Sequence, residues 1–410
     1  MGWEGKKITR RVLRFGDNGA DVRRLQDFLS RQGYDLGEEE RYGYLTRDAV
    51  SQFQREHGLR VDGIAGPQFF DLIRQKGLPS RRRVHLVQPG ETLESIAGSY
   101  GLDPGAFGCS NRLKQIYPGR RLVFFDREVW GISKKTIPNF PRDQLTGLIA
   151  LAPNQRHSPL GIPCIAQADL KSEDEIVQIH ELLRNRKRRE RAVEELFLKA
   201  EGASGIYLPW QKMSPLDGRR YLSFLRMLIK KLKENQLLLV ELGPGIPQWK
   251  VWGGLDYGRV NRLSHRIVLR APIFTHPQPV LDRNKMETLL NSLGAQVYPW
   301  KILLRIPVFA VEWELTAKGA KWTKLSYAAA LSRVFRFGAR LKEDGRGRPF
   351  YSFRRGGSEF QLYLPSYNVL GEVLALINLY NLAGVILDSL GQEDPRFWGV
   401  LSSYFRSAQL

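Results

Sequence analysis

Residues 140–410 alternate short β-rich runs with amphipathic helical stripes, and this alternation constrains the fold more than any other feature. One such stripe, residues 221–232, has apolar side chains at the three- and four-residue spacing of a helix. Strand and helix in alternation predict an α/β (β/α)8 TIM-type barrel. The first strand–helix turn of the barrel is short or has only a weak sequence pattern. We read seven strands: 145–150, 162–166, 205–208, 237–242, 266–269, 301–307 and 384–387.

The chain of 410 residues is too long for one compact domain, and two smaller units precede the barrel. In the first unit, residues 10–79, apolar residues recur at helical spacing in segments 22–29 and 49–54. Thr46 stands where a helix cap is needed, and Gly58 ends that helix. A turn rich in Gly and Pro then leads into a third helix. These signals predict a small three-helix domain.

This first unit resembles the three-helix peptidoglycan-binding domain found beside cell-wall hydrolases. The pattern G-x-x-G-x-x-V-x-x-LQ, followed by T-x-x-AV-x-x-FQ-x-x-x-GL-x-x-DG-x-x-GP, is kept almost throughout. The departure is Phe69, where a threonine is common. Most of these positions are core and cap positions of a helical bundle. The resemblance, and not the spacing, implies peptidoglycan as the ligand.

The second unit, residues 83–126, begins with a strand at 84–87 and a turn at 88–92. A helical stripe over 93–100 and a last strand at 121–123 follow, which predicts a βααβ unit. It resembles a LysM domain, whose elements V-x-x-G-[DE]-T-L-x-x-I-A, N and x-PG-x-x-L are all present.

The LysM resemblance implies recognition of an N-acetylglucosamine backbone by the loops after the first strand and before the last. Backbone donors and acceptors suit the acetamido group, and aliphatic side chains suit its methyl. Leu93 can equally be a core residue, whereas Tyr117 is less easily explained that way. The implied glycan-binding residues are Gly90, Glu91, Thr92, Leu93, Ile116, Tyr117 and Pro118.

Several stretches of the predicted barrel resemble glycoside hydrolase family 18, particularly the LysM-bearing glycosidases of the spore cortex. These stretches are 188–206, 301–307, 384–386 and 390–398. The family carries D-x-x-D-x-D-x-E at barrel strand four. Its glutamate protonates the leaving oxygen, and the preceding aspartate orients the substrate acetamide.

The alignment places Ser204 at the first acidic position, Tyr207 and Pro209 at the next two, and Gln211 at the position of the acid. An amide has no proton to deliver, so Gln211 cannot act as a general acid. The strand-six motif M-x-Y-D aligns with residues 270–273, which lack the aspartate. The tryptophan that would form the base of the sugar-binding site aligns with Asp388. We therefore predict a barrel without catalytic activity.

The alternative is an active N-acetylglucosaminidase that uses relocated carboxylates. Four of these follow other predicted strands and could meet at the mouth of the barrel: Glu241, Glu312, Glu314 and Asp388. The interpretation we favour is that Glu312 and Glu314 face solvent or pair with arginines, because no spacing links these carboxylates into a recognised catalytic arrangement. Five tryptophans could stack on sugars or belong to the core: Trp210, Trp249, Trp252, Trp300 and Trp313.

The formal net charge of +21 favours an anionic partner. The densest basic run, residues 184–191, is typical of a solvent-exposed helix face. A nucleic-acid binder is a third interpretation, but no zinc-finger spacing or aromatic RNA-binding signature accompanies the charge. We expect no cofactor and no metal. Cys109 and Cys164 are expected to be buried small residues.

The N-terminus shows no apolar signal segment, and no run approaches the 18 apolar residues of a membrane helix. Taken with the resemblances, this predicts the spore cortex or coat, or the cell wall, of an endospore-forming bacterium. The expected partner is peptidoglycan or another N-acetylglucosamine polymer. Spore coat or cortex proteins are further candidates.

Overall fold

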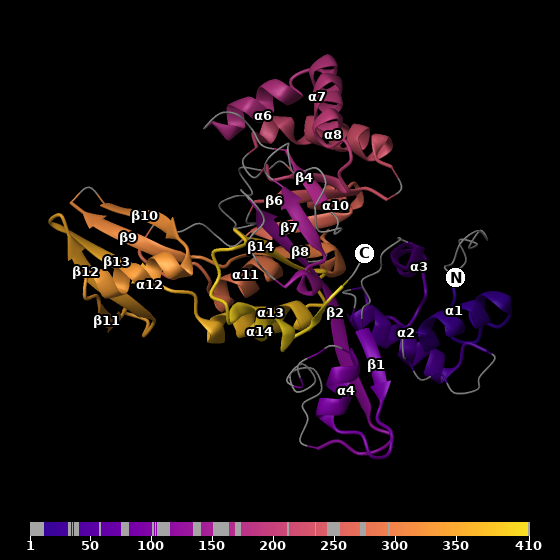
Figure 1. Ribbon diagram of the computed structural model, residues 1–410. Helices are drawn as coiled ribbons and strands as arrows, with labels where there is room; N and C mark the ends of the chain where they lie inside the picture. The colour runs from indigo at the N-terminus through magenta and orange to yellow at the C-terminus, as the bar shows by residue number, and fades with distance from the viewer. Residues whose placement is uncertain are drawn as a thin grey trace.

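The computed structural model places a central barrel between two small N-terminal domains and a projecting antiparallel sheet (Figure 1). Within the part of the chain that it describes, no helix is long and apolar enough to cross a membrane. The described residues are 12–31, 34, 36, 41–56, 59–74, 82–100, 102, 104, 115–133, 141–150, 164–168, 174–210, 213–233, 235–243, 255–270, 276–293, 296–317 and 319–408.

The first domain consists of α1 (Ala20–Arg31), α2 (Tyr44–Glu56) and α3 (Pro67–Arg74) around a buried apolar core. The glutamine of the FQ motif has a structural role. Gln54 donates from Nε2 to the Ile64 carbonyl at 2.9 Å and accepts at Oε1 from the Gly63 amide at 2.9 Å. The turn before α3 is thereby fixed by a side chain from α2.

The second domain pairs β1 (Arg82–Leu86) antiparallel with the start of β2 (Arg121–Ser133), and α4 (Leu93–Tyr100) packs on them. Its core is small and apolar, with Ile96 and Leu122 at the centre. The expected second helix would fall within residues 105–114, which lie outside the described residues.

The strand β2 is shared between the second domain and the barrel. Up to Phe125 it pairs with β1, from Glu128 it pairs with β14 (Gly384–Asp388), and from Trp130 it also pairs with β3 (Gly147–Ala150). The expected barrel start at residue 140 was therefore wrong, because the first barrel strand lies ahead of it. A continuous strand leaves no flexible linker between the two domains.

Eight parallel strands close the barrel, with β2 pairing both β3 and β14, and this confirms the predicted fold class. The other barrel strands are β3 (Gly147–Ala150), β4 (Cys164–Gln167), β5 (Gly205–Leu208), β6 (Leu237–Leu242), β7 (Arg266–Arg270), β8 (Ile302–Pro307) and β14 (Gly384–Asp388). Each of the seven predicted strands corresponds to one of these. Cys164 is buried in the core, and Cys109 lies outside the described residues.

Helices cover the outside of the barrel and bury a large apolar core against the strands. The α-helices are α6 (Glu175–Leu183), α7 (Arg186–Lys199), α8 (Gly218–Lys231), α10 (Tyr257–Arg262), α11 (Arg283–Leu293), α13 (Tyr367–Leu379) and α14 (Phe397–Ser402). Short 3-10 helices are η1 (Arg142–Gln144), η3 (Pro215–Asp217) and η6 (Pro299–Lys301), and β15 (Arg406–Ser407) pairs β2.

An insertion between β8 and β14, not predicted from the sequence, forms a separate five-stranded antiparallel sheet that projects from the barrel (Figure 1). Helix α12 (Tyr327–Arg336) lies against it, and Phe353 stacks between Phe337 and Phe360 at 5.1 and 5.3 Å. Its strands are β9 (Ala310–Thr316), β10 (Gly319–Leu325), β11 (Arg340–Glu343), β12 (Pro349–Arg355) and β13 (Ser358–Tyr363), in the order β10-β9-β13-β12-β11.

The first domain is packed against the barrel through Trp300 of η6. This indole is 1% exposed and belongs to the apolar core of the first domain, with Tyr298 stacked on it at 5.4 Å. Both N-terminal domains are thus attached to the barrel, one by side-chain packing and the other by a shared strand.

The closeness of neighbouring strands makes Gly205 a sensitive position. A Cβ there would lie 2.2 Å from the Leu237 carbonyl oxygen, which is backbone and cannot move aside cheaply. We expect Gly205→Ala to destabilise the barrel by about 1–3 kcal/mol or more. Gly399→Ala is the control, because that helical glycine has open space around it. Denaturant unfolding of both variants tests this, and equal midpoints would contradict it.

Candidate functional sites

The two LysM-like loops lie side by side, held by backbone hydrogen bonds. The Val87 amide donates to the Arg120 carbonyl at 2.9 Å, and the Gly119 amide donates to the Val87 carbonyl at 2.8 Å. The structure therefore brings together the two segments, 87–93 and 115–120, that contain all the expected glycan-binding residues.

Two of these residues shape the first loop. The Glu91 carboxylate accepts from the Gln88 amide at 2.7 Å and contacts His85 Nε2 at 2.7 Å. These hydrogen bonds, the backbone one first, lower the pKa of Glu91. Thr92 caps α4, because its Oγ1 accepts from the Ser95 amide at 3.1 Å. His85 was not predicted, since no local motif links it to the turn.

The remaining loop residues divide into buried and exposed. Leu93 and Ile116 pack against the domain core. Tyr117 is 59% exposed, and the Arg120 guanidinium lies 5.5 Å from its ring centroid. Gly90 and Pro118 are exposed at the two turns. Tyr117 is therefore the large side chain of these loops that is free to stack on a sugar ring.

A second group of polar residues lies at the C-terminal ends of the barrel strands, which we call the barrel mouth. Arg305 of β8 lies between two carboxylates. Its Nη1 donates to Glu241 of β6 at 2.9 Å, and its Nη2 donates to Asp388 of β14 at 3.0 Å. Tyr207 of β5 accepts from Arg305 Nη1 at 3.1 Å and donates to Glu241. One guanidinium thus joins three strands.

Further cations surround Asp388. Lys324 of β10 approaches its Oδ1 at 3.5 Å and also contacts the Ser389 hydroxyl, while Arg270 of β7 approaches Oδ2 at 3.9 Å. Ser389 has a φ of 73°, which is unusual for a residue other than glycine. The insertion therefore supplies a charge to the barrel mouth.

The protonation states follow from this arrangement. Burial alone would raise the pKa of Asp388, but the charges of Arg305, Lys324 and Arg270 outweigh it and lower that pKa. Burial, followed by the charge of Glu241, raises the pKa of Tyr207 well above its usual value. At neutral pH Asp388 is ionised and Tyr207 is a neutral phenol.

The positions aligned with the family-18 acids do not assemble a carboxylate cluster. Tyr207 points into the mouth, but Ser204 lies at the opposite end of β5, where its amide donates to the Cys164 carbonyl at 2.7 Å. Pro209 directly follows β5 and is half-buried, and Gln211 lies outside the described residues.

Only two of the four alternative carboxylates meet at the barrel mouth, namely Glu241 and Asp388. Glu312 and Glu314 lie on β9 of the insertion. Glu312 is buried and pairs with Arg333 and, at 3.7 Å, with Arg355. Arg305 was not predicted, although a charged residue inside the otherwise apolar strand β8 was a usable signal.

Three of the tryptophans are core residues. Trp210 donates to the Ala168 carbonyl at 3.0 Å and stacks on Phe224, and Trp313 donates to the Gln278 carbonyl at 3.2 Å. Trp300 packs against the first domain. All three are nearly inaccessible to solvent, so they cannot serve as sugar platforms. Trp249 and Trp252 lie outside the described residues.

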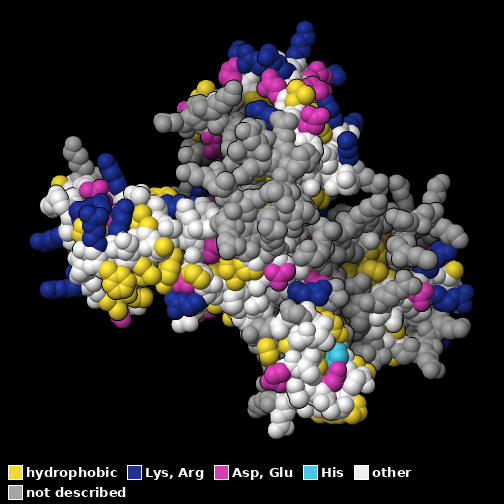
Figure 2. Space-filling view, in the orientation of Figure 1, with side chains coloured by type: hydrophobic (Ala, Val, Ile, Leu, Met, Phe, Trp, Pro, Cys, Tyr) yellow, Lys and Arg dark blue, Asp and Glu magenta, His cyan; other side chains and the backbone are white. Residues whose placement is uncertain are grey.

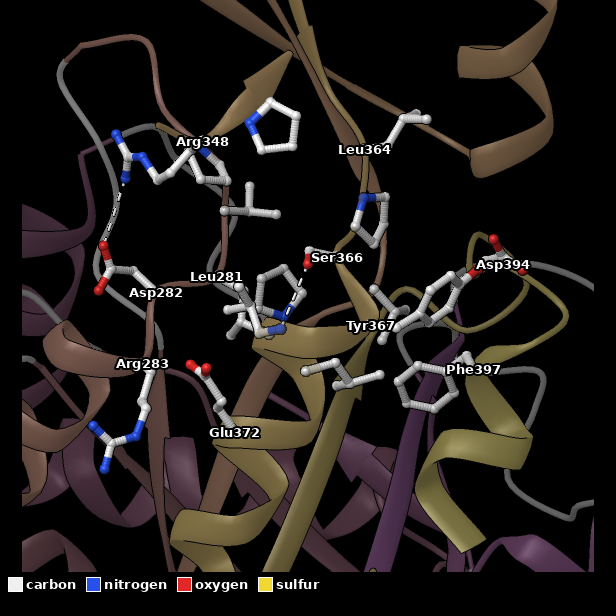
Figure 3. Close-up of a pocket in the computed structure, with 18 of the residues that line it drawn as sticks. Leu281, Asp282, Arg283, Arg348, Leu364, Ser366, Tyr367, Glu372, Asp394 and Phe397 are labelled. Carbon is white, nitrogen blue, oxygen red and sulfur yellow. Dashed lines mark hydrogen bonds and ion pairs between the residues drawn. The ribbon is translucent and has the colours of Figure 1, made fainter. Parts of the chain in front are cut away.

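A separate pocket of about 240 Å³ lies between the insertion and helices α11 and α13 (Figure 3). Its wall is mainly apolar, with Leu281, Leu364 and Phe397. Two of its carboxylates are already paired, Asp282 with Arg348 and Asp394 with Arg396. The pocket reaches the end of β8 at Pro307, but Arg305, Glu241 and Asp388 do not line it.

The basic run at 184–191 is a mixed-charge helix surface. Arg186 pairs with Glu190 at 2.8 Å, and Arg191 pairs with Glu195 at 3.0 Å. Figure 2 shows acidic and basic side chains intermingled over α6 and α7. This surface does not resemble the continuous basic stripe of a nucleic-acid site.

Comparison with known families identifies the two N-terminal domains. Residues 18–73 match the family described as "Putative peptidoglycan binding domain", and residues 85–125 match the LysM domain. The chain therefore carries a region that matches a peptidoglycan-binding family and a LysM domain, followed by a closed eight-stranded parallel barrel whose fold resembles that of TIM-type glycosidases.

Particular proteins resemble different parts of the chain. The spore cortex-lytic enzyme SleL of Bacillus cereus is 15% identical, with a TM-score of 0.58 over 97% of this chain and 99% of that one. The chitinase-like agglutinin of Robinia pseudoacacia is 12% identical, with a TM-score of 0.51 over 67% and 99%. A chloroplastic protein of Arabidopsis thaliana, named protein disulfide isomerase pTAC5, is 40% identical over 63 residues, or 14% of this chain and 16% of that protein.

Removing Arg305 tests the charge network. In Arg305→Met, Glu241 and Asp388 stay buried without their shared guanidinium, and we expect a loss of about 3–5 kcal/mol at pH 7. Loss of the Arg305 charge leaves burial less opposed and raises the pKa of Asp388, so the variant should regain stability as the pH falls from 7 to 5.

The stability of the unmodified protein changes with pH in the opposite direction. Its Asp388 has a lowered pKa, so the stabilisation from ionised Asp388 is complete above the ordinary carboxyl pKa. That stabilisation is lost only as the pH falls through the lowered pKa. Denaturant midpoints at both pH values, with the exposed Arg226→Met as control, test this. A loss of equal size at pH 7 and pH 5 would contradict the assignment.

Proposed function

We propose that this protein binds peptidoglycan through its two N-terminal modules and that its barrel holds wall polymer without cleaving it. The two family matches support cell-wall glycan binding directly. The observation that carries the second part is the Arg305 guanidinium, which pairs both carboxylates at the barrel mouth.

Glycoside hydrolysis needs a carboxylic acid that can deliver a proton to the leaving oxygen. Asp388 is held ionised by three cations, so it has no proton to give at neutral pH. Glu241 accepts from both Arg305 and Tyr207, which is the hydrogen bonding of a carboxylate. Gln211, at the aligned acid position, is an amide.

The fold by itself does not decide between binding and cleavage. Both a spore cortex-lytic enzyme and a chitinase-like agglutinin resemble this chain over the barrel. The alternative is an active N-acetylglucosaminidase that uses relocated carboxylates, and it is favoured by the convergence of Glu241 and Asp388 on one mouth. It would require substrate to displace Arg305 from one of them.

We place the protein at the cell wall or spore cortex, which the peptidoglycan-binding modules and the SleL-like fold support. An endospore-forming source, and spore coat or cortex proteins as further partners, remain predictions. Two modules fixed to one barrel raise avidity, because binding of the first increases the effective concentration of the second.

Tyr117 is the residue whose removal tests glycan binding. Tyr117→Ala deletes the exposed ring without touching the domain core, so we expect weaker binding to purified sacculi, by about 5- to 30-fold, and unchanged thermal stability. Phe335→Ala is the matched control, since that ring is 79% exposed on the insertion. Co-sedimentation at increasing salt is the measurement.

Two results would oppose the proposal. Equal sedimentation of the unmodified protein and Tyr117→Ala would show that Tyr117 and the LysM loop around it do not contribute to binding. Loss of all binding at high salt would favour a purely electrostatic partner, as in the nucleic-acid interpretation.

A further inference from the structure

Among the described residues of the barrel mouth, three cations lie close to two carboxylates. Among the described residues that these contacts join, Arg270, Arg305 and Lys324 meet the carboxylates Glu241 and Asp388. Arg305 alone forms close contacts with both carboxylates, at 2.9 and 3.0 Å. The other two cations share an Asp388 that already accepts two bonds from Arg305.

Arg270 has an unfavourable neighbour. In the β7–β8 pairing it stands directly beside Arg305, and like charges at paired strand positions repel. Its closest described carboxylate oxygen, on Asp388, is 3.9 Å away, longer than a hydrogen bond. An additional anion at this position would relieve the repulsion.

Arg270 and Lys324 are more exposed to solvent than the two carboxylates of the barrel mouth. The Glu241 and Asp388 side chains are 0% and 9% exposed, and Arg305 is 11% exposed. Lys324 and Arg270 are 26% and 33% exposed. A ligand approaching the mouth therefore meets positive groups first, with the carboxylates beneath them.

Lys324 is also held in place on several sides. Its ammonium lies 3.9 Å from the Phe309 ring centroid and contacts the Ser389 hydroxyl. Ser389 keeps its left-handed backbone conformation while its Oγ donates to Asp388 Oδ1 at 3.0 Å. Backbone strain of this kind tends to persist at ligand sites, where the surrounding structure fixes it.

We propose that Arg270 and Lys324 at the barrel mouth bind an anionic group of the wall polymer, either a peptide carboxylate or a phosphate. This inference rests on the proposed function, since it names the ligand class of the barrel. Guanidinium and ammonium groups supply several donors to such oxygens, and the partly buried position strengthens the attraction. The network beneath keeps both cations oriented toward the ligand.

Calorimetric titration of the full chain tests the proposal. The probes are a soluble disaccharide-peptide with free carboxylates, the same compound with its carboxylates amidated, and orthophosphate. We expect amidation to weaken binding at least about tenfold, as loss of one charge-assisted contact does. Arg270→Gln should bind the free acid as weakly as the parent binds the amide, and Arg270→Lys should retain most of the affinity.

The exposed Arg226→Gln on α8 is the control and should bind like the parent. Preference for orthophosphate over the free acid would assign the site to wall phosphate, and the reverse would assign it to peptide carboxylate. Equal binding of acid and amide, or unchanged binding by Arg270→Gln, would overturn the proposal. Sacculus co-sedimentation tests glycan binding by the LysM loops, and calorimetry tests anion binding at the barrel mouth. A negative result in one experiment is therefore distinguishable from a negative result in the other.

Discussion

The pairing of Arg305 with Glu241 and Asp388 is the interaction on which the character of the barrel depends. It joins strands β6, β8 and β14 at the end where barrel enzymes place their reacting groups. Without this guanidinium the two buried carboxylates would lose their shared cationic partner. With it, Asp388 stays ionised and Glu241 accepts hydrogen bonds from Arg305 and Tyr207, and the more exposed cations lie above them.

The barrel could be predicted because its signals are local: each apolar strand run and each helical stripe is visible within a few residues. The first strand was missed since β2 continues from the second domain and carries Asp126, Arg127 and Glu128 where the barrel begins. The insertion was missed because its antiparallel strands follow β8 without a break that the sequence marks.

The two sites differed in how far the sequence could specify them. The two LysM loops follow local sequence motifs, so the positions of Gly90–Leu93 and Ile116–Pro118 in loops could be predicted and their glycan binding stays a prediction. The role of Glu91 in fixing a turn required coordinates. The barrel mouth could not be assembled in advance. Glu241 and Asp388 lie 64 and 83 residues from Arg305 in the sequence, and only closure of the barrel brings them together.

The central claim is that the barrel binds wall polymer without hydrolysing it, and muropeptide analysis tests it most directly. Purified protein is incubated with spore cortex and vegetative peptidoglycan, and released fragments are identified by mass spectrometry. A variant in which Glu241, Glu312, Glu314 and Asp388 are all replaced by their amides serves as control. We predict protein bound to the sacculi and no newly released glycan fragments. Shortened glycans produced by the parent and absent with the variant would contradict the account and place an active acid/base pair among those four carboxylates.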